Sequence, residues 1–250
     1  MTSIGILGAA GRMGRAVAQA AIAAGHQLVG GVDLGGAIEG PYADAGALAA
    51  HCDVLVDFSA PIALPGHLAA ARAAKTPIVI GTTGLQPADH GLIDQAVAEI
   101  AVLQAANTSL GVTLLAQLVR EAAARLGEDW DIEVLEMHHR HKVDAPSGTA
   151  LLLGKAAAEG RGGTLEKLSR YNRMDGEPHR RETGTIGYAS LRGGSAAGDH
   201  LVIFASDNER IELGHRAENR GIFAQGAVKA AVWLAGQPAG RYAMTDVLGL

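Results

Sequence analysis

Short apolar runs alternate with longer stretches of helical spacing through the first half of the chain. Residues 3–7 form such a run, and Val17, Ala21 and Ile22 then recur at the spacing of one helix face. Strands that alternate with helices predict a parallel sheet with helices on both of its faces. The predicted strands cover 3–7, 27–32, 53–58, 76–80 and 101–105, and the later predicted helices cover 62–74 and 86–100.

The pattern changes beyond residue 110, where strand-like runs follow one another without helices between them. Such a succession predicts a mixed or antiparallel sheet that helices cover on one side. The polar stretch 160–182 is expected to be mobile, and the last apolar helix is expected to pack back on the first part of the chain. The predicted helices here cover 112–126, 147–159 and 222–234, and the predicted strands cover 131–136, 185–191, 201–205 and 211–215.

A glycine-rich turn, Gly8-Ala9-Ala10-Gly11-Arg12-Met13-Gly14, joins the first strand to the first helix. Gly8 permits a tight turn, Gly11 lets the backbone approach a pyrophosphate, and Gly14 lets helix and strand pack closely. Strand, glycine turn and helix are the context in which dinucleotides bind, although a turn of this spacing also suits a connection that binds no nucleotide.

Asp33 stands at the end of the second predicted strand, close to the offset of roughly 20 residues at which a carboxylate binds the adenine ribose hydroxyls. No lysine or arginine is nearby to pair with a 2′-phosphate, and Asp33 and Glu39 would repel one. NADH is therefore the expected cofactor in preference to NADPH. Arg12 and Arg15 could still reach a 2′-phosphate, which leaves NADPH as an alternative cofactor.

Three predicted strand ends carry small and polar residues that suit contacts with a nicotinamide and its ribose. In a parallel sheet, ligands lie beyond the carboxyl ends of the strands. Any one of these segments would equally suit an ordinary turn, but three on consecutive strands favour a cofactor site. The segments are Phe58-Ser59-Ala60-Pro61, Gly81-Thr82-Thr83-Gly84 and Ala105-Ala106-Asn107-Thr108-Ser109.

These features predict an α/β protein with two domains. A Rossmann-type doubly wound parallel sheet over 1–108, completed by 217–250, would bind the dinucleotide. A smaller α+β domain with a mixed sheet over 109–216 would hold the remainder of the site.

Five consecutive residues, His138 to Lys142, can each carry or accept a proton where the chain leaves the predicted strand 131–136. A helix follows from Ser147, and helix starts favour anions through their backbone amides and the helix dipole. A solvated basic turn is the alternative. The whole chain has a net charge of −5, so this basic cluster is opposite in sign to the protein as a whole. The contrast favours a site for a small anion.

The remaining composition narrows the class of protein. The net negative charge gives no reason to expect nucleic-acid binding, and no apolar run reaches the roughly 18 residues of a membrane helix. The only cysteine, Cys52, forms no internal disulfide and indicates a reducing compartment, so we expect a cytoplasmic location. No metal is expected, because the adjacent His138 and His139 cannot readily converge on one ion and have no nearby cysteine partner.

The segment Glu136-Met137-His138-His139-Arg140-His141-Lys142-Val143-Asp144-Ala145-Pro146-Ser147-Gly148-Thr149-Ala150 closely resembles the signature of the 4-hydroxy-tetrahydrodipicolinate (dihydrodipicolinate) reductase family. The resemblance covers essentially the whole chain and includes 8–14, 81–84, 184–187 and 223–228. It implies an NADH- or NADPH-dependent enzyme of the diaminopimelate route to lysine, acting on a small cyclic imine-type dicarboxylate. It also implies a homotetramer assembled through the sheet of the second domain.

By the same resemblance, His138 is the proton donor and Lys142 is the second catalytic residue. The implied substrate contacts are His139, Lys142, Ser147, Gly148 and Thr149. The implied cofactor contacts are the glycine turn, Asp33, Phe58, Gly81, Thr82, Thr83, Ala105, Ala106, Asn107 and Thr108. This chain departs from the family pattern at Asp33 and Leu34, where some members have glutamate and arginine, and at Thr108, where an aromatic residue is frequent.

Two other functions stay open. An NAD-dependent amino-acid or aldehyde dehydrogenase could use the same scaffold, but Cys52 lies away from the motif, which disfavours a thiohemiacetal mechanism. A non-catalytic NAD-sensing module would leave a proton donor beside an anion-binding helix unexplained. Isolated histidines such as His67 are expected to be structural, whereas the roles of His141 and of Arg220, near the return to the first domain, are left open.

Overall fold

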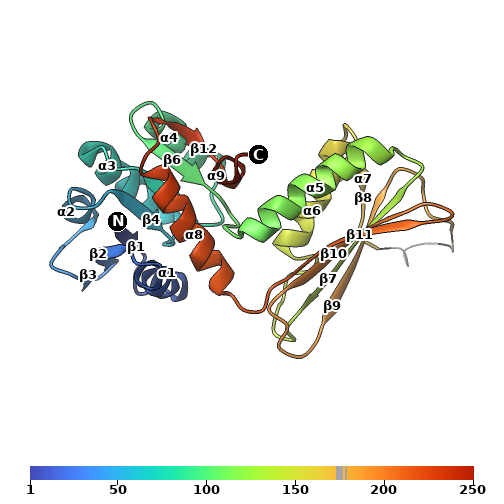
Figure 1. The fold of residues 1–250 in the computed structure, drawn as a ribbon, viewed down its shortest axis with the longest axis horizontal. Helices are drawn as coiled ribbons and strands as arrows, with labels where there is room; N and C mark the ends of the chain where they lie inside the picture. The colour runs from blue at the N-terminus through green and yellow to red at the C-terminus, as the bar shows by residue number, and fades with distance from the viewer. Residues whose placement is uncertain (173–176, 178) are drawn as a thin grey trace. The chain divides into compact units, whose positions relative to one another are not determined.

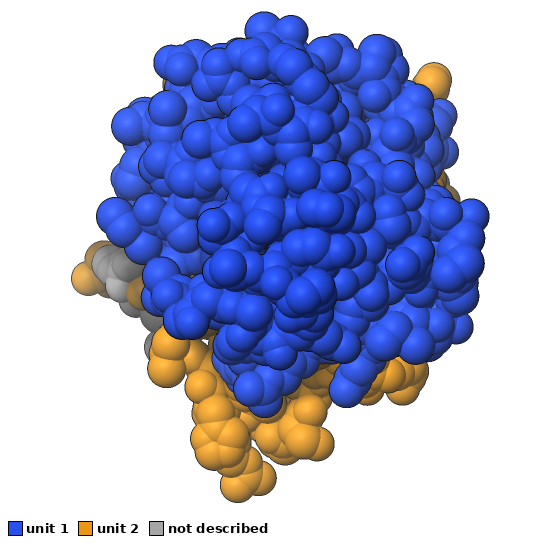
Figure 2. All heavy atoms as spheres, turned by 90° about the vertical axis from the view of Figure 1, so that its left-hand side faces the viewer, with its two compact units in different colours: residues 1–110, 221–250 blue, residues 111–220 orange. Residues whose placement is uncertain are grey.

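The computed structural model of the chain describes residues 1–172, 177 and 179–250 (Figure 1). The chain divides into two compact units, Met1–Leu110 with Gly221–Leu250 and Gly111–Arg220, which Figure 2 colours separately. It leaves the first unit once and then returns to it. Each unit is built around a sheet of its own.

Within the described residues, a sheet of seven strands forms the centre of the first unit. In chain order the strands are β1 (Ser3–Leu7), β2 (Gln27–Asp33), β3 (Gly36–Glu39), β4 (Val54–Asp57), β5 (Ile78–Ile80), β6 (Ala101–Gln104) and β12 (Gly240–Tyr242). Their spatial order is β12-β6-β5-β4-β1-β2-β3, and neighbours run parallel except that β3 is antiparallel to β2. The predicted doubly wound parallel sheet is confirmed, and one edge collects the carboxyl ends of the parallel strands.

Helices cover both faces of this sheet. Because side chains alternate along a strand, Val54 and Val56 pack on one side while Leu55 packs on the other. The first side meets α1 (Arg12–Ala23) and α8 (Gly221–Leu234), and the second meets α2 (Ala45–Ala49), α3 (Leu64–Ala74) and α4 (Pro87–Ala96). The apolar helix near the end of the chain therefore packs back on the first unit, as its sequence predicts.

Short elements of the first unit lie outside the predicted pattern. They are β3, α2, β12 and α9 (Met244–Leu248), and they have too few residues to show a clear hydrophobic period. Local hydrogen bonds define them instead: at the start of α2, Asp44 Oδ1 accepts from the Ala47 amide at 2.8 Å. The helix predicted over 86–100 was too long, because a tight turn after Ala96 leads into β6.

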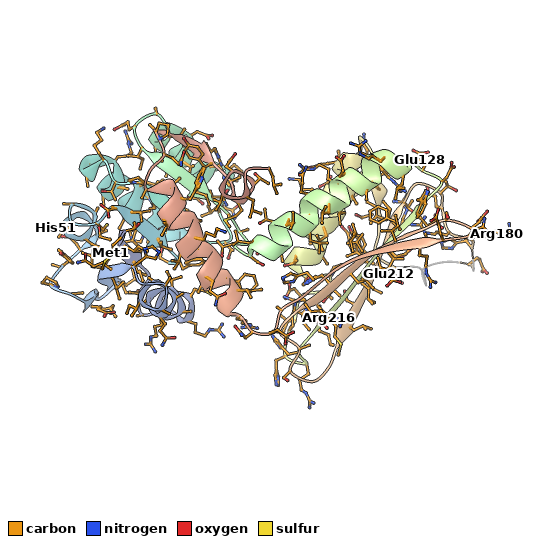
Figure 3. All side chains as sticks on the ribbon, in the orientation of Figure 1. Met1, His51, Glu128, Arg180, Glu212 and Arg216 are labelled. Carbon is orange, nitrogen blue, oxygen red and sulfur yellow. The ribbon has the colours of Figure 1, made fainter. Side chains whose placement is uncertain are left out.

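A sheet of five strands forms the second unit, again counted over the described residues. In chain order the strands are β7 (Asp131–His138), β8 (Ser169–Arg170), β9 (Ile186–Arg192), β10 (Asp199–Ala205) and β11 (Arg210–Arg216). In the order β11-β10-β7-β9-β8, strand β9 runs parallel to β7 and β8, whereas β10 runs antiparallel to β7 and β11. The predicted mixed sheet is confirmed. Glu212 and Arg216 mark its edge strand β11 in Figure 3.

Helices α5 (Leu110–Leu126) and α6 (Gly148–Gly160) cover one face of the second sheet. Alternation along β7 turns Ile132 and Val134 toward them, where they pack in one cluster with Leu153. Glu136 and His138 follow on the same face of β7 and are also buried. The alternation that builds the core therefore also delivers two titratable side chains into it.

The polar stretch 160–182, predicted to be mobile, forms regular structure in part. Helix α7 (Leu165–Leu168) and strand β8 lie within it, whereas positions 173–176 and 178 are outside the described residues. Near its end, Arg181 donates a hydrogen bond to Glu133 on β7 at 3.0 Å. Long-range contacts of this kind leave no periodic mark in the sequence.

Gly226 lies where α8 crosses the turn that ends at Thr108. A Cβ atom at position 226 would lie 1.8 Å from the Thr108 carbonyl oxygen, so alanine would force the helix and the turn apart. We expect Gly226→Ala to destabilise the protein by about 1–3 kcal/mol. The midpoint of urea unfolding should fall accordingly.

Gly91→Ala is the matched control. Gly91 is exposed within α4, and an added Cβ atom would meet nothing within 4 Å. Alanine favours the helix more than glycine does, so this change should stabilise the protein by about 0.5–1 kcal/mol. Equal urea midpoints for the two variants would contradict the close packing of α8 on the Thr108 turn.

Candidate active site

The glycine turn after β1 brings backbone groups into close contact. Gly8 has a φ of 78°, and a Cβ atom there would lie 2.7 Å from the Phe58 carbonyl oxygen. At Gly14 a Cβ atom would lie 2.3 Å from the Gly8 carbonyl oxygen, so turn and helix pack backbone to backbone. Gly11 is the N-cap of α1 and supplies no side-chain cap. The start of α1 is therefore suited to an anion such as a pyrophosphate.

Asp33 ends β2 and fastens this turn. Its Oδ2 accepts a hydrogen bond from the Ala10 amide at 2.9 Å, and its Oδ1 accepts one from the Leu34 amide at 2.8 Å. Each carboxylate oxygen can accept a second hydrogen bond, so the side chain can also receive a ribose hydroxyl.

Asp33 also lines a cavity of about 430 Å³ in the first unit. This volume falls within the range of small-molecule sites. Its walls include four of the residues expected to bind a cofactor, which are Gly8, Gly11, Asp33 and Phe58. Further walls come from Leu34, Ser59, Ile62 and His67.

The ends of β4 and β5 meet through Phe58 and Gly81. A Cβ atom at Gly81 would lie 2.2 Å from Phe58 Cε1, so the ring can take this place only beside glycine. The Gly81 amide donates to the Asp57 carbonyl at 2.8 Å, and Thr82 Oγ1 donates to Asp57 Oδ1 at 3.2 Å. Two of the predicted strand ends thus form one connected structure.

Asp57 is a fully buried carboxylate that the sequence interpretation missed. It accepts hydrogen bonds from the Ser59 amide at 2.9 Å and the Ser59 hydroxyl at 2.6 Å, and its Oδ2 lies 2.8 Å from His67 Nδ1. His67, expected to be merely structural, braces this turn and also lines the cavity. The only signal in the sequence is an acidic residue at the end of an apolar run.

The third predicted strand end follows β6. The Ala105 amide donates to the Ile80 carbonyl at 3.0 Å, which sets this segment beside β5. Thr108 Oγ1 donates to the Phe223 carbonyl at 2.7 Å, which ties the segment to α8. The residues Ala105, Ala106, Asn107 and Thr108 therefore lie at the next strand end and outside the lining of the cavity.

His138 ends β7 and is 8% exposed. Its Nδ1 lies 2.5 Å from Glu136 Oε2, and Arg192 donates to the two oxygens of Glu136 at 2.9 and 2.8 Å. Burial alone would raise the pKa of Glu136, but hydrogen bonds from Arg192 and His138 help to lower it to about 2. Glu136 is therefore a lasting carboxylate partner for His138.

His139 and Lys142 lie on the loop after β7. His139 Nε2 accepts a hydrogen bond from Arg220 Nη2 at 2.8 Å, and desolvation together with this guanidinium lowers the pKa of His139. Lys142 Nζ lies 2.8 Å from Asp144 Oδ1, and this hydrogen bond lowers the pKa of Asp144. His141 is exposed, with its ring centroid 6.2 Å from that of His139.

Ser147 begins α6 as its N-cap. Its Oγ accepts a hydrogen bond from the Ala150 amide at 3.1 Å and lies 3.0 Å from His200 Nε2. Gly148 and Thr149 are the first two residues of the helix, where the dipole favours an anion. The predicted substrate-binding residues therefore surround the start of one helix and the loop that leads to it.

Four residues of this site were not predicted as site residues, namely Glu136, His200, Arg192 and Asp144. His200 is 5% exposed, and burial lowers its pKa to about 4, so its ring is neutral. The register between β7 and β9 places Arg192 beside His138. Sequence spacing does not reveal the register between strands. For His200, the available signal was that a histidine stands within the apolar run of β10.

Across the described ranges, no group of three histidine, cysteine, aspartate or glutamate side chains is placed to hold a metal ion. In the same part of the chain, no helix is both long enough and apolar enough to cross a membrane. Cys52 is a free cysteine, and burial raises the pKa of its thiol to about 11, which keeps it protonated.

The first unit has a parallel sheet with a glycine turn at the start of a helix, and the second has a mixed sheet that carries His138 and precedes Lys142. This architecture is that of a two-domain, dinucleotide-dependent oxidoreductase. The chain belongs to the dihydrodipicolinate reductase family. The family's N-terminal domain matches residues 2–108, and its C-terminal domain matches residues 111–248. The family resemblance found in the sequence is thereby confirmed.

Individual relatives agree with this assignment. The 4-hydroxy-tetrahydrodipicolinate reductase of Zymomonas mobilis is 63% identical over 248 residues, which cover 99% of this chain and 97% of the relative. The enzyme of the same name from Parvibaculum lavamentivorans is 49% identical and covers 98% and 97%. The structure of a dipicolinate-bound dihydrodipicolinate reductase from Paenisporosarcina sp. TG-14 shares the fold, with a TM-score of 0.79 at 23% identity over 98% of each chain.

His200 makes the stability of the protein depend on pH. Burial lowers its pKa from 6.5 to about 4, so between these values the unfolded chain binds a proton that the folded chain does not. The free energy of unfolding should therefore decrease as the pH falls through this window, by at most about 1.4 kcal/mol per pH unit. In His200→Gln, urea unfolding at a series of pH values should show a smaller decrease.

The comparison concerns the slope of stability against pH, so a uniform loss of stability in the variant does not affect it. Glutamine keeps a hydrogen-bonding group for the Ser147 hydroxyl but cannot titrate. Parallel curves for the wild type and the variant would show that His200 is not the residue responsible.

Proposed function

We propose that this chain catalyses the NAD(P)H-dependent reduction of 4-hydroxy-tetrahydrodipicolinate to tetrahydrodipicolinate, in the diaminopimelate pathway of lysine biosynthesis. Full-length similarity to relatives named for this reaction supports the proposal. The observation that carries it is the buried pair of Glu136 and His138, joined to the start of α6 through the Ser147 amide. A proton donor and an anion-binding helix start thus belong to one hydrogen-bonded structure.

The dinucleotide-binding domain predicted over 1–108 and 217–250 is proposed to hold the cofactor. The uncapped start of α1 suits the pyrophosphate, and the cavity beside Asp33 suits a nucleoside. When bound, the reduced nicotinamide supplies the hydride. The proposed contacts are Gly8, Ala9, Ala10, Gly11, Arg12, Met13, Asp33, Phe58, Gly81, Thr82, Thr83, Ala105, Ala106, Asn107 and Thr108.

The preference for NADH over NADPH is inferred from Asp33. Two backbone amides, of Ala10 and Leu34, hold its carboxylate at the cavity, where a 2′-phosphate would meet a like charge. The Leu34 side chain is 90% exposed and offers no positive partner. Arg12 and Arg15 lie on α1 and leave NADPH as an alternative cofactor.

Asp33→Asn tests this preference. Asparagine keeps an oxygen acceptor for the turn and removes the negative charge. We expect the ratio of kcat/KM for NADPH to kcat/KM for NADH to rise about tenfold, equivalent to about 1.4 kcal/mol. Steady-state oxidation of both cofactors measures this ratio, and a wild type that already prefers NADPH would overturn the inference.

The domain predicted over 109–216 is proposed to hold the substrate and perform the proton transfer. His138 is the proposed proton donor, since histidine is the most frequent general acid in enzymes and this ring is held by a carboxylate. Lys142 is proposed to offset the negative charge that grows on the substrate as hydride arrives. The Lys142 side chain is 20% exposed and that of Asp144 54%, so Lys142 is proposed to exchange Asp144 for a substrate carboxylate.

The two carboxylates of the substrate require donors as well. The proposed contacts are His139, Lys142, Ser147, Gly148 and Thr149. The Ser147 hydroxyl already contacts the Ala150 amide and His200, so its main contribution is to begin the helix. The Gly148 amide and the helix dipole then favour the anion.

Lys142→Ala should separate catalysis from cofactor binding. We expect kcat to fall about 100-fold or more, because a group that stabilises developing charge is lost. The Kd for NADH should stay unchanged, because the glycine turn belongs to the other unit. Oxidation of NADH with freshly prepared 4-hydroxy-tetrahydrodipicolinate measures kcat, and a fluorescence titration with NADH measures the Kd.

Lys155→Ala is the control for this prediction. Lys155 is an exposed lysine of α6 that pairs with Glu159, so its loss should leave kcat at the wild-type value. Wild-type turnover in Lys142→Ala would remove Lys142 from the catalytic residues. A wild type that binds NADH but never oxidises it with this substrate would instead favour an NAD-sensing module.

A homotetramer assembled through the sheet of the second unit is also proposed. The sheet face opposite α5 and α6 carries a groove lined in part by Leu135, Met137, Leu191 and Leu201. Leu191 is exposed and the other three are partly exposed, and apolar side chains that reach solvent together are typical of an interaction surface. Sedimentation velocity reports the assembly, and a monomer at micromolar concentration would contradict it.

A cytoplasmic location is proposed with the pathway. The free, partly buried thiol of Cys52 fits a reducing compartment. Fractionation of cells tests this location, and recovery of the protein outside the cytoplasmic fraction would contradict it.

A further inference from the structure

Glu136 occupies a position where a charge is costly. It is 1% exposed, on the face of β7 that packs against the helices. A buried carboxylate is tolerated only where donors surround it. Hydrogen bonds from its neighbours outweigh the effect of burial and hold its pKa at about 2, so it stays ionised at any working pH.

The two oxygens of Glu136 share Arg192 as a partner, and each has one further partner of its own. Oε2 lies 2.5 Å from His138 Nδ1 and accepts from Arg192 Nη1 at 2.9 Å. Oε1 accepts from Arg192 Nη2 at 2.8 Å and from the Ser147 amide at 3.3 Å. A guanidinium that binds both oxygens prevents the carboxylate from rotating. Oε2 is therefore held against the His138 ring.

This contact determines which nitrogen of His138 carries a proton in both the neutral and the positively charged ring. An ionised carboxylate can only accept hydrogen bonds, so Nδ1 must be the donor in the contact with Glu136. Nε2 is then the atom from which the doubly protonated, positively charged ring can release a proton and become neutral. Gly198 lies beside Nε2, where a Cβ atom would lie 3.0 Å from it. The ring of His200 also packs against His138, with the two ring centroids 5.1 Å apart.

The same carboxylate also anchors the loop that carries Lys142. The loop begins at His138 and ends at Ser147, and Glu136 binds both of these residues. Arg192 adds a further tie, since its Nη2 donates to the Asp144 carbonyl at 2.6 Å. The orientation of the proton donor and the position of the lysine loop therefore depend on one side chain.

We propose that Glu136 is the positioning residue of the reaction: it fixes His138 in the form with Nδ1 protonated, presents Nε2 to the substrate, and is itself held by Arg192. The inference rests on the proposed function, in which His138 donates the proton. A carboxylate in this place also compensates the positive charge of the ring that is ready to donate. The alternative is that Glu136 serves only as a structural partner of Arg192.

Glu136→Gln distinguishes the two roles. Arg192 donates to both oxygens of Glu136, so an amide turns its NH2 group toward an Arg192 donor in either orientation. The substitution also removes the negative charge that is held against the His138 ring. We expect kcat to fall about 100-fold or more, with the KM for NADH unchanged. A merely structural role would lower stability and the amount of folded enzyme, but not kcat per folded active site.

Glu133→Gln is the matched control. Glu133 is also a carboxylate of β7 bonded to an arginine, Arg181, but it lies on the opposite face of the strand. The substitution removes the same charge from the same strand and should leave kcat at the wild-type value. Equal kcat values for Glu136→Gln and Glu133→Gln would overturn the proposal.

A measurement on the wild type distinguishes the positioning role of Glu136 from a merely structural one even if Glu136→Gln fails to fold. Nitrogen-15 NMR of protein labelled in its histidine rings reports which ring nitrogen carries the proton, and His138→Gln assigns the signal by its loss. At a pH where the His138 ring is neutral, we expect Nδ1 to be protonated and Nε2 to be bare. A ring protonated at Nε2 instead would overturn the proposal.

Different results would contradict the proposed function and the positioning role of Glu136. If the wild type does not oxidise NADH with 4-hydroxy-tetrahydrodipicolinate, the proposed function fails. If it does so while His138 carries its proton on Nε2, the reaction stands and the positioning role of Glu136 fails.

Discussion

A buried carboxylate must be surrounded by hydrogen-bond donors, and this constraint shapes the candidate site in both units. Asp57 at the end of β4 takes its donors from the turn that follows the strand and contacts the ring of His67. Glu136, near the end of β7, takes its donors from Arg192 and the start of α6 and contacts the ring of His138. In each unit, one buried acid therefore folds the turn beyond its strand and orients a histidine.

The two acids differ in what they offer a ligand. Asp57 is met mainly by hydroxyl and amide donors, and with His67 it shapes a wall of the cavity in the first unit. Glu136 is met by a guanidinium that binds both of its oxygens, which is the stronger and more directional arrangement. The first arrangement suits the binding and orientation of a ligand, whereas the second holds charged groups in fixed positions, as the proposed proton transfer requires.

Much of this could be predicted from the sequence, because the relevant signals are local. Alternating strands and helices predicted the parallel sheet, the glycine turn predicted its ligand-binding edge, and the family signature indicated His138 and Lys142. The contributions of Asp57, Arg192 and His200 could not be predicted, because they depend on which strands pair and in what register. Short elements such as β3 and α2 could not be predicted for another reason. They depend on single caps and edge contacts rather than on a periodic pattern of hydrophobic residues.

The pairing of Lys142 with Asp144 shows how a site can be prepared without being blocked. The Asp144 side chain is 54% exposed, and ion pairs open to solvent are worth only about 0–1 kcal/mol. A substrate carboxylate can therefore replace Asp144 at little cost, and a helix start beside the loop adds a second attraction that Asp144 does not use. Glu136 is bound to Arg192 in a buried pair, where the loss of one partner is far more costly. The exchangeable contact thus lies on the loop that is proposed to meet the substrate, and the lasting one lies in the core beneath it.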